Sequence, residues 1–377
     1  MLEYFSIKRE VFGLDISDLS LKIAQIKKRE GELELVSFGE TRIEPGIIKN
    51  GEIIDDNKLA RTIETAVRQV KGEKIKTKYV IASLPEEKAF LQVIQMPKVP
   101  EEDLSSAVAY EAENYIPTAL EQVYLDFQIV SPLENRLGHY DILIAALPKQ
   151  TVNPYVSSLK LAGLEPVALE IESLSIARTL IKDEMTTLPI LLIDFGATRT
   201  SFIIFSGHSL RFTSSISVSS NHFTEIIMKA LGINQKKAES LKIKYGLIGK
   251  TKANNNKGTI KKEERKIFEA LIPVLVDLTQ QIRKHLEYYQ THAGHKHLPV
   301  KNKKVSKIIL CGGGSNLKGL PELLSMELKL PVEIGNPWIN IIKEEGEASL
   351  TKEQSLAYAT ALGLALRAIK ENNKYGA

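Results

Sequence analysis

Several patterns that mark large classes of protein are scarce or absent in this sequence. Its 377 residues include one cysteine, Cys311, so internal disulfide bonds are excluded and a reducing compartment is indicated. No apolar run approaches the roughly 20 residues that a membrane-spanning helix requires. The opening stretch MLEYFSIKREVFGLDI contains no apolar segment of the secretory type. We therefore expect a cytoplasmic protein without a membrane span of its own.

A large excess of charge of either sign is also missing. The 50 Lys and Arg residues oppose 46 Asp and Glu residues, and the formal net charge is +4. So small an excess gives no reason to expect binding to nucleic acid. The Asn- and Lys-rich stretch 249–266 is interpreted as an exposed loop, because charge runs are mostly solvated. The length of the chain favours two domains or lobes.

Two stretches, about half the chain apart, share an arrangement. FGLDISDLSLKIAQI (12–26) reads as an apolar strand with Asp15 near its end, a short polar turn and a returning strand. LLIDFGATRTSFIIF (191–205) repeats this pattern with Asp194 in the matching place. Segments of helical spacing follow each meander. The sequence therefore predicts an internal duplication into two α/β lobes, with a boundary between residues 165 and 188.

The composition of these turns suits phosphate binding. Turns rich in Gly, Ser and Thr present backbone N–H groups to phosphate oxygens. In the second turn Gly196 permits close approach, and Thr198 and Thr200 add hydroxyl donors. Asp15 and Asp194 are suitable for holding Mg²⁺ through water. The alternative is two ordinary hairpins whose aspartates cap their turns, but the repetition in one chain favours the phosphate hypothesis.

A third motif is the glycine run in KIILCGGGSNLKGL (307–320). An apolar strand leads to Gly312, Gly313 and Gly314, and a helix capped by Ser315 or Asn316 is expected to follow. Three glycines leave room for a ligand against bare backbone, and a helix N-terminus favours an anion. The run is not a P-loop, because the pattern G-x-x-x-x-G-K-[ST] is absent.

In this order the three motifs resemble the phosphate 1, phosphate 2 and adenosine motifs of the actin, Hsp70 and FtsA superfamily. Within it the chain resembles the PilM family of type IV pilus assembly proteins, through segments such as LPEEKAFLQVIQMPKVPEEDLSSAVAYEAENYIP and AGLEPVALEIESLSIAR. The resemblance implies an actin-like (ribonuclease H-like) α/β fold of two lobes with a small FtsA-type inserted subdomain. It also implies ATP with Mg²⁺ in the cleft between the lobes, with slow hydrolysis at most.

The resemblance also implies domain boundaries. The first lobe is expected to comprise residues 1–42 and 166–187 with the helix 352–370. The inserted subdomain is expected at 43–165 and the second lobe at 188–351.

The resemblance assigns nucleotide-binding roles to residues of each motif. In KKAESLKIKYG it places Glu239 and Lys242 near the ribose and base, and their i, i+3 spacing puts both on one helix face. An ordinary surface ion pair fits this spacing equally well. The full expected set is Asp15, Ser17, Lys22, Asp194, Gly196, Thr198, Glu239, Lys242, Gly312, Gly313 and Gly314, with Asp15 and Asp194 serving Mg²⁺.

One turn departs from the family pattern. Members of the family usually have Gly after the Asp-Ile of phosphate 1, whereas this turn reads DISDLS, with Ser17 and Asp18. We expect Asp18 to add negative charge where phosphate should lie, at a cost of over about 1 kcal/mol at short range. Lys22 is a candidate to offset that charge. A degenerate relative that binds no nucleotide therefore remains an alternative.

The partner implied by the resemblance is a short N-terminal cytoplasmic peptide of the membrane protein PilN. Its groove is expected between the first lobe and the inserted subdomain, with Glu111, Glu113 and Tyr115 meeting a basic, apolar peptide. The protein would then be peripheral to the inner membrane through this partner. Self-association stays open, and an enzyme of the sugar kinase or Hsp70-type ATPase class is the alternative function.

Overall fold

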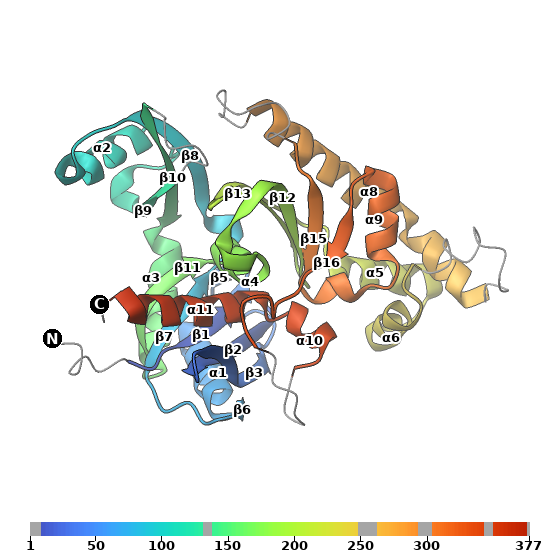
Figure 1. Ribbon diagram of the computed structural model, residues 1–377. Helices are drawn as coiled ribbons and strands as arrows, with labels where there is room; N and C mark the ends of the chain where they lie inside the picture. The colour runs from blue at the N-terminus through green and yellow to red at the C-terminus, as the bar shows by residue number, and fades with distance from the viewer. Residues whose placement is uncertain (1–8, 131–137, 248–261, 293–303, 343–349, 375–377) are drawn as a thin grey trace.

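The computed structural model describes residues 9–130, 138–247, 262–292, 304–342 and 350–374. Two sheets dominate it, with helices on their faces (Figure 1). The first sheet contains, in spatial order, β11 (Glu165–Ile171), β7 (Tyr79–Leu84), β1 (Phe12–Ile16), β2 (Ser20–Arg29), β3 (Glu32–Arg42) and β6 (Lys71–Gly72). The second contains β14 (Ser209–Ile216), β13 (Thr200–Gly207), β12 (Thr186–Phe195), β15 (Lys307–Cys311) and β16 (Val332–Ile334).

The two sheets repeat one strand order. In the first, β1, β2 and β3 form an antiparallel meander, and β7 and β11 lie parallel beside β1. In the second, β12, β13 and β14 form the meander, and β15 and β16 lie parallel beside β12. This repetition confirms the predicted duplication. It also places Asp15 and Asp194 at equivalent strand ends.

Helices bury the first sheet on both faces, which explains the nearly continuous apolar run of β1. On one face lie α1 (Asp56–Arg68) and α3 (Lys149–Leu161), whose side chains share a core with β1 and β2. The start of α1 is set by its N-cap, Asp55, which accepts a hydrogen bond from the Lys58 N–H at 2.9 Å. A small hairpin, β4 (Ile48–Lys49) with β5 (Glu52–Ile53), precedes α1.

The helices α4 (Glu172–Leu180) and α11 (Ala359–Lys374) pack against each other between the two sheets, α11 on the first and α4 beneath the second (Figure 1). Their contact depends on glycine, because a Cβ on Gly363 would lie 2.0 Å from the Ser175 carbonyl oxygen. Likewise, a Cβ on Gly13 would lie 2.5 Å from the Ala361 carbonyl oxygen, so α11 rests directly on β1. This pair of helices joins the two lobes, and we call it the hinge.

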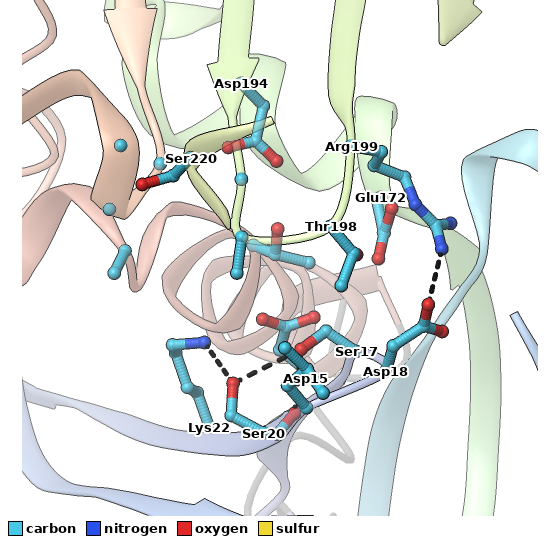
Figure 2. A pocket seen from close by; sticks show the side chains of 18 of the residues that line it. Asp15, Ser17, Asp18, Ser20, Lys22, Glu172, Asp194, Thr198, Arg199 and Ser220 are labelled. Atoms are coloured by element: carbon cyan, nitrogen blue, oxygen red, sulfur yellow. Dashed lines mark hydrogen bonds and ion pairs between the residues drawn. The ribbon is translucent and has the colours of Figure 1, made fainter. Parts of the chain in front are cut away.

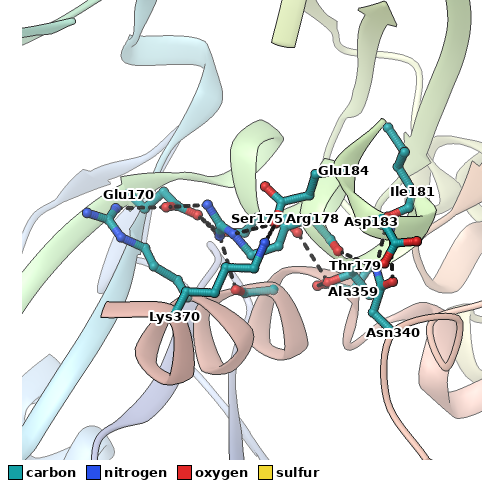
Figure 3. A network of polar contacts seen from close by, with 12 residues as sticks. Glu170, Ser175, Arg178, Thr179, Ile181, Asp183, Glu184, Asn340, Ala359 and Lys370 are labelled. Atoms are coloured by element: carbon teal, nitrogen blue, oxygen red, sulfur yellow. Dashed lines mark hydrogen bonds and ion pairs between the residues drawn. The ribbon is translucent and has the colours of Figure 1, made fainter. Parts of the chain in front are cut away.

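A polar network ties the hinge together (Figure 3). The buried carboxylate of Glu170, at the end of β11, pairs with Arg178 of α4 at 2.5 Å and Arg367 of α11 at 2.7 Å. Burial alone would raise the pKa of Glu170, but the two guanidinium groups outweigh burial and lower it.

Among the described residues, four helices pack on the second sheet. The outer face of the second sheet carries α5 (Ser220–Leu231), α6 (Gln235–Tyr245), α8 (Lys262–His292) and α9 (Leu320–Leu328), around a core containing Phe195, Phe202 and Phe223. Of the predicted loop 249–266, residues 249–261 lie outside the described residues. The prediction is wrong for residues 262–266, because α8 begins at Lys262. The predicted helix 352–370 is divided into α10 (Lys352–Leu356) and α11.

A third sheet forms a small separate unit, at the upper left of Figure 1. It consists of β8 (Phe90–Pro97), β10 (His139–Pro148) and β9 (Val123–Val130), covered by α2 (Glu101–Ala112) around its own apolar core. By contrast β7, α1 and α3, inside the predicted 43–165 insertion, belong to the first lobe, because β7 pairs with β1 and both helices share its core. We therefore propose a narrower inserted subdomain, residues 85–148.

Candidate functional site

A cavity of about 360 Å³ lies between the two lobes, where β1 and β12 end. Its volume falls within the range of pockets that bind small molecules. Ten of the eleven residues predicted to contact the nucleotide line it; only Lys242 does not. These ten are Asp15, Ser17, Lys22, Asp194, Gly196, Thr198, Glu239, Gly312, Gly313 and Gly314.

The first turn is rigid because its polar groups bond to one another. The Ser17 N–H and hydroxyl both donate to the Ser20 carbonyl oxygen at 3.0 Å. Lys22, opposite Asp15 in the β1–β2 register, donates its Nζ to the Ser20 hydroxyl at 2.7 Å. Figure 2 shows Lys22, Ser20 and Ser17 linked along the floor of the cavity. A buried lysine is thereby held at the cavity wall.

The two aspartates lie on opposite sides of this cavity, Asp15 from the first lobe and Asp194 from the second (Figure 2). Burial raises the pKa of Asp15, while Lys22 and the Ser83 hydroxyl, which donates to Asp15 at 3.2 Å, oppose that shift. Burial and the Asp15 charge raise the pKa of Asp194 to about 6. The site therefore favours the arrival of positive charge between the two carboxyl groups.

The second turn is joined to a helix N-terminus. The Gly196 N–H donates to the Arg199 carbonyl oxygen at 3.0 Å and closes the turn. The turn is then held by the first residues of α5, whose Ser220 N–H donates to the Gly196 carbonyl oxygen at 3.0 Å. Ser219 caps α5, and Ser220 and Asn221 line the cavity. The positive end of the helix dipole therefore lies at the cavity.

The glycine run touches the second aspartate, and here one prediction is wrong. The run does not open an α-helix capped by Ser315 or Asn316: a short 3₁₀ segment, Gly313–Asn316, follows, and α9 begins only at Leu320. All three glycines line the cavity, and a Cβ on Gly312 would lie 2.2 Å from Asp194 Oδ1, so glycine allows this close packing on the second turn. Glycine at 312 is also required by its φ of 81°.

Glu239 and Lys242 share one face of α6, as predicted. Lys242 Nζ lies 2.8 Å from the Glu239 carboxylate and also donates to the Ser220 carbonyl oxygen at 2.9 Å and to Thr224. The pair is not an ordinary surface ion pair, because the lysine is buried and burial lowers its pKa. Glu239 reaches the cavity, whereas Lys242 lies behind it and fixes the start of α5.

Asp18 lines the cavity, so its negative charge does lie at the phosphate turns, but the charge is paired. Its carboxylate accepts hydrogen bonds from the backbone N–H groups of Asn50 at 3.2 Å and Gly51 at 2.9 Å. It also pairs with the Arg199 guanidinium at 3.0 Å, across the cleft (Figure 2). The counter-charge is therefore Arg199 of the second turn, while Lys22 bonds to Ser20.

Glu172 is a cavity residue that the sequence argument missed. It is the first residue of α4, and it lines the cavity beside the two aspartates. Burial raises the pKa of Glu172 well above its ordinary value, and the charges of Asp15 and Asp194 add to the shift. The signal in the sequence was weak: an acid after the alternating stretch VALEI reads as a helix start.

The lining as a whole suits a phosphate chain accompanied by a divalent cation. Among the described residues, no group of three or more His, Cys, Asp or Glu side chains is arranged to hold a metal ion by itself. Mg²⁺ in general keeps much of its water and binds through few carboxylates together with phosphate. Lys22 and the α5 N-terminus supply positive charge, and the glycine run lines the cavity without side chains.

The residues predicted to bind a peptide lie at the end of α2, away from this cavity. Glu111 is half-buried in the last turn of the helix, and Glu113 and Tyr115 are exposed just beyond it. Partial burial raises the pKa of the Tyr115 hydroxyl, and Glu111 adds to the shift by its charge and a hydrogen bond. The structure thus brings Glu111 and Tyr115 together.

Comparison with known proteins identifies the family of the chain. The family model described as type IV pilus assembly protein PilM matches residues 13–369. The chain belongs to this family. A solved structure of a PilM–PilN type IV pilus biogenesis complex is 27% identical, with a TM-score of 0.77, over 96% of this chain and 99% of the matched chain.

Two relatives outside the PilM family share the actin-like fold. The cell division protein FtsA of Streptococcus pneumoniae serotype 2 (strain D39) is 23% identical over 93% of this chain and 83% of its own length. MreB5 of Spiroplasma citri bound to AMPPNP is 16% identical, with a TM-score of 0.57, over 99% of this chain and all of that chain. No helix in the described part of this PilM-family chain is long and apolar enough to cross a membrane.

Proposed function

We propose that this PilM-family protein binds ATP with Mg²⁺ in the cleft between its lobes. The observation that carries the proposal is the convergence of both phosphate turns and the glycine run on one cavity. The three segments lie far apart in the sequence, and each contributes polar or glycine residues to the lining of this one cavity.

Each wall of the cavity has a role in this proposal. The glycine run would lie against the adenosine end of the nucleotide, and Glu239 would approach the ribose. The two turns and the α5 N-terminus would bind the phosphates through backbone N–H groups. Bound Mg²⁺ would neutralise phosphate charge, with Asp15 and Asp194 holding its water ligands. Because that charge is positive, it would relieve the repulsion between the two buried carboxyl groups.

Calorimetric titration of ATP with Mg²⁺ into the purified protein tests this proposal. We expect micromolar binding by the wild type and a loss of at least about tenfold in Asp194→Ala, since a ligand to the metal shell is removed. Asp126→Ala, at an exposed position of β9, is the matched control and should bind like the wild type. Absence of binding by the wild type would overturn the proposal and leave a scaffold of actin-like shape.

We propose further that the chain is a cytoplasmic scaffold of a type IV pilus assembly platform at the inner membrane. Its partner would be the N-terminal peptide of a PilN-like membrane protein, which would hold it peripherally at that membrane. Family membership supports this role, as does the likeness to a chain of a PilM–PilN complex. The contact residues would be Glu111, Glu113 and Tyr115, which present acidic groups beside an aromatic ring. Self-association stays a prediction.

A further inference from the structure

Arg199 bridges both sides of the cleft. It is the last residue of the second phosphate turn, just before β13, and its guanidinium lies 3.0 Å from Asp18 of the first turn. The same guanidinium forms an ion pair with Glu87. The three side chains are at most 18% exposed. An ion pair so enclosed is screened much less by salt than an exposed one.

The three partners come from three parts of the molecule. Asp18 is fixed to the first lobe by the Asn50 and Gly51 N–H groups. Glu87 lies in the short 3₁₀ segment Glu86–Lys88, which links β7 of the first lobe to β8 of the inserted subdomain. Arg199 belongs to the second lobe. These contacts therefore join both lobes and the root of the inserted subdomain at one point.

The position of the Arg199 ion pairs relative to the hinge determines what they do when the lobes move. The lobes are connected at the hinge by α4 and α11, where Glu170 pairs with Arg178. Arg199 and Asp18 lie on the cleft side of that hinge, on opposite walls of the cavity. Rotation that opens the cleft moves these walls apart, so it must break the Arg199–Asp18 pair.

We propose that Arg199 is a latch that holds the lobes closed over the cleft and joins that closure to the root of the inserted subdomain. The latch also accounts for the departure of the first turn from the family pattern: Asp18 stands there as the partner of Arg199. The latch sets how fast a ligand enters and leaves the cavity; the identity of that ligand rests on the proposed function, whereas the closure does not.

The direct test measures the distance between the lobes in the ligand-free protein. Spin labels at Thr65→Cys on α1 and Lys236→Cys on α6 occupy exposed positions, and native Cys311 is fully buried and should not react. We expect double electron–electron resonance to give a longer or broader distance distribution in Arg199→Gln. The matched control is Arg265→Gln, which removes an exposed arginine of the same lobe.

Two further variants separate the latch from a general loss of structure. Asp18→Asn keeps one oxygen as an acceptor for a backbone N–H group of Asn50 or Gly51 but removes the negative charge that attracts Arg199. Glu87→Gln removes the second negative charge beside Arg199. Both should broaden the distribution in the same direction, with cooperative unfolding retained by circular dichroism. Distributions that superimpose on the wild type in Arg199→Gln and Asp18→Asn would overturn the latch.

A kinetic measurement connects the latch to the ligand. In stopped-flow experiments with a fluorescent ATP analogue and Mg²⁺, we expect release from Arg199→Gln to be faster by about fivefold or more, the scale of common coupling between sites. If no variant and no wild-type protein binds the analogue, the proposed function fails, and the distance measurement still decides the latch. If the analogue binds, and Arg199→Gln changes the distance between the lobes but not the release rate, then closure does not control ligand exchange. In that case the kinetic part of the proposal is wrong.

Discussion

At the scale of single residues, Asp194 is a buried carboxyl group that lowers the stability of the folded protein. Its ordinary pKa of 3.8 is raised to about 6 in the folded protein, mainly by burial and then by Asp15. The folded state therefore binds a proton more tightly than the unfolded state between these two values. Stability falls as pH rises through this window, because the folded protein must then accept a buried charge. At pH 7 the free energy of unfolding of the ligand-free protein is therefore lowered by the full effect of this buried charge.

We expect Asp194→Asn to stabilise the ligand-free protein at pH 7 by about 1–3 kcal/mol, since a two-unit shift corresponds to roughly that energy. The variant should also lose part of the decline in stability between pH 4 and pH 6. Urea unfolding at a series of pH values measures both effects. Asp126→Asn serves as the exposed control, and a destabilised Asp194→Asn protein with an unchanged pH profile would contradict the argument.

Single residues also show what the sequence could reveal about this site. Asp15 and Asp194 were predictable because each follows an apolar run and precedes a polar turn, a pattern visible within 15 residues. The pairing of Asp18 with Arg199 was not, because the partners lie 181 residues apart and only the fold brings them together. Glu172 was missed for the same reason: its neighbours in space come from other segments.

At the scale of elements, the contact between α4 and α11 is set by a glycine. A Cβ at position 363 would meet backbone of α4 at 2.0 Å, and backbone cannot move aside as a flexible side chain can. We expect Gly363→Ala to destabilise the protein by about 2–3 kcal/mol through overpacking. Gly138→Ala, where a Cβ meets nothing within 4 Å, should change stability by less than about 0.5 kcal/mol. Thermal unfolding of both variants compares them, and equal effects would refute the close contact.

The charge network of the hinge leads to a separate prediction. Glu170→Gln leaves Arg178 and Arg367 without their shared carboxylate. We expect a loss of about 3 kcal/mol at pH 7, the usual effect of breaking a buried pair. Because the pKa of Glu170 is lowered, its stabilisation is present above its ordinary pKa of 4.5 and is lost as pH falls below it.

Chemical denaturation at pH 7 and pH 3 measures this difference, with the exposed Glu269→Gln as the control. A loss in Glu170→Gln that is equally large at both pH values would show that the carboxylate charge is not what matters.

Elements near each turn were predictable, but their assignment to lobes was not. The returning strands follow their turns directly, so each meander could be identified along the chain. The place of β7 depends on parallel pairing with β1, which leaves no local mark in the sequence. Helical spacing identified α1, yet spacing does not say which sheet a helix covers. The predicted insertion therefore took in elements that share the core of the first lobe.

At the scale of the whole molecule, the proposed partner site and the cleft are separate and can be tested apart. We expect a peptide from the N-terminus of a matching PilN-like protein to bind with micromolar affinity and to bind at least about tenfold more weakly to Tyr115→Ala, since exposed aromatic residues dominate such contacts. Fluorescence anisotropy measures the affinity. Tyr288→Ala, another half-exposed tyrosine but on α8, is the control. Equal affinity of both variants would remove α2 from the proposed site.

The packing of α11 on β1 has a consequence for synthesis on the ribosome. Val11, just before β1, and Ile81 of β7 are buried against Leu364 and Ala368 of α11. One face of that sheet therefore stays bare until about 280 further residues have followed β7. The second sheet, by contrast, receives α4 before its own strands are made. The nascent chain must therefore carry an uncovered apolar sheet through most of translation, and a chaperone that binds such surfaces would find its longest-lived target there.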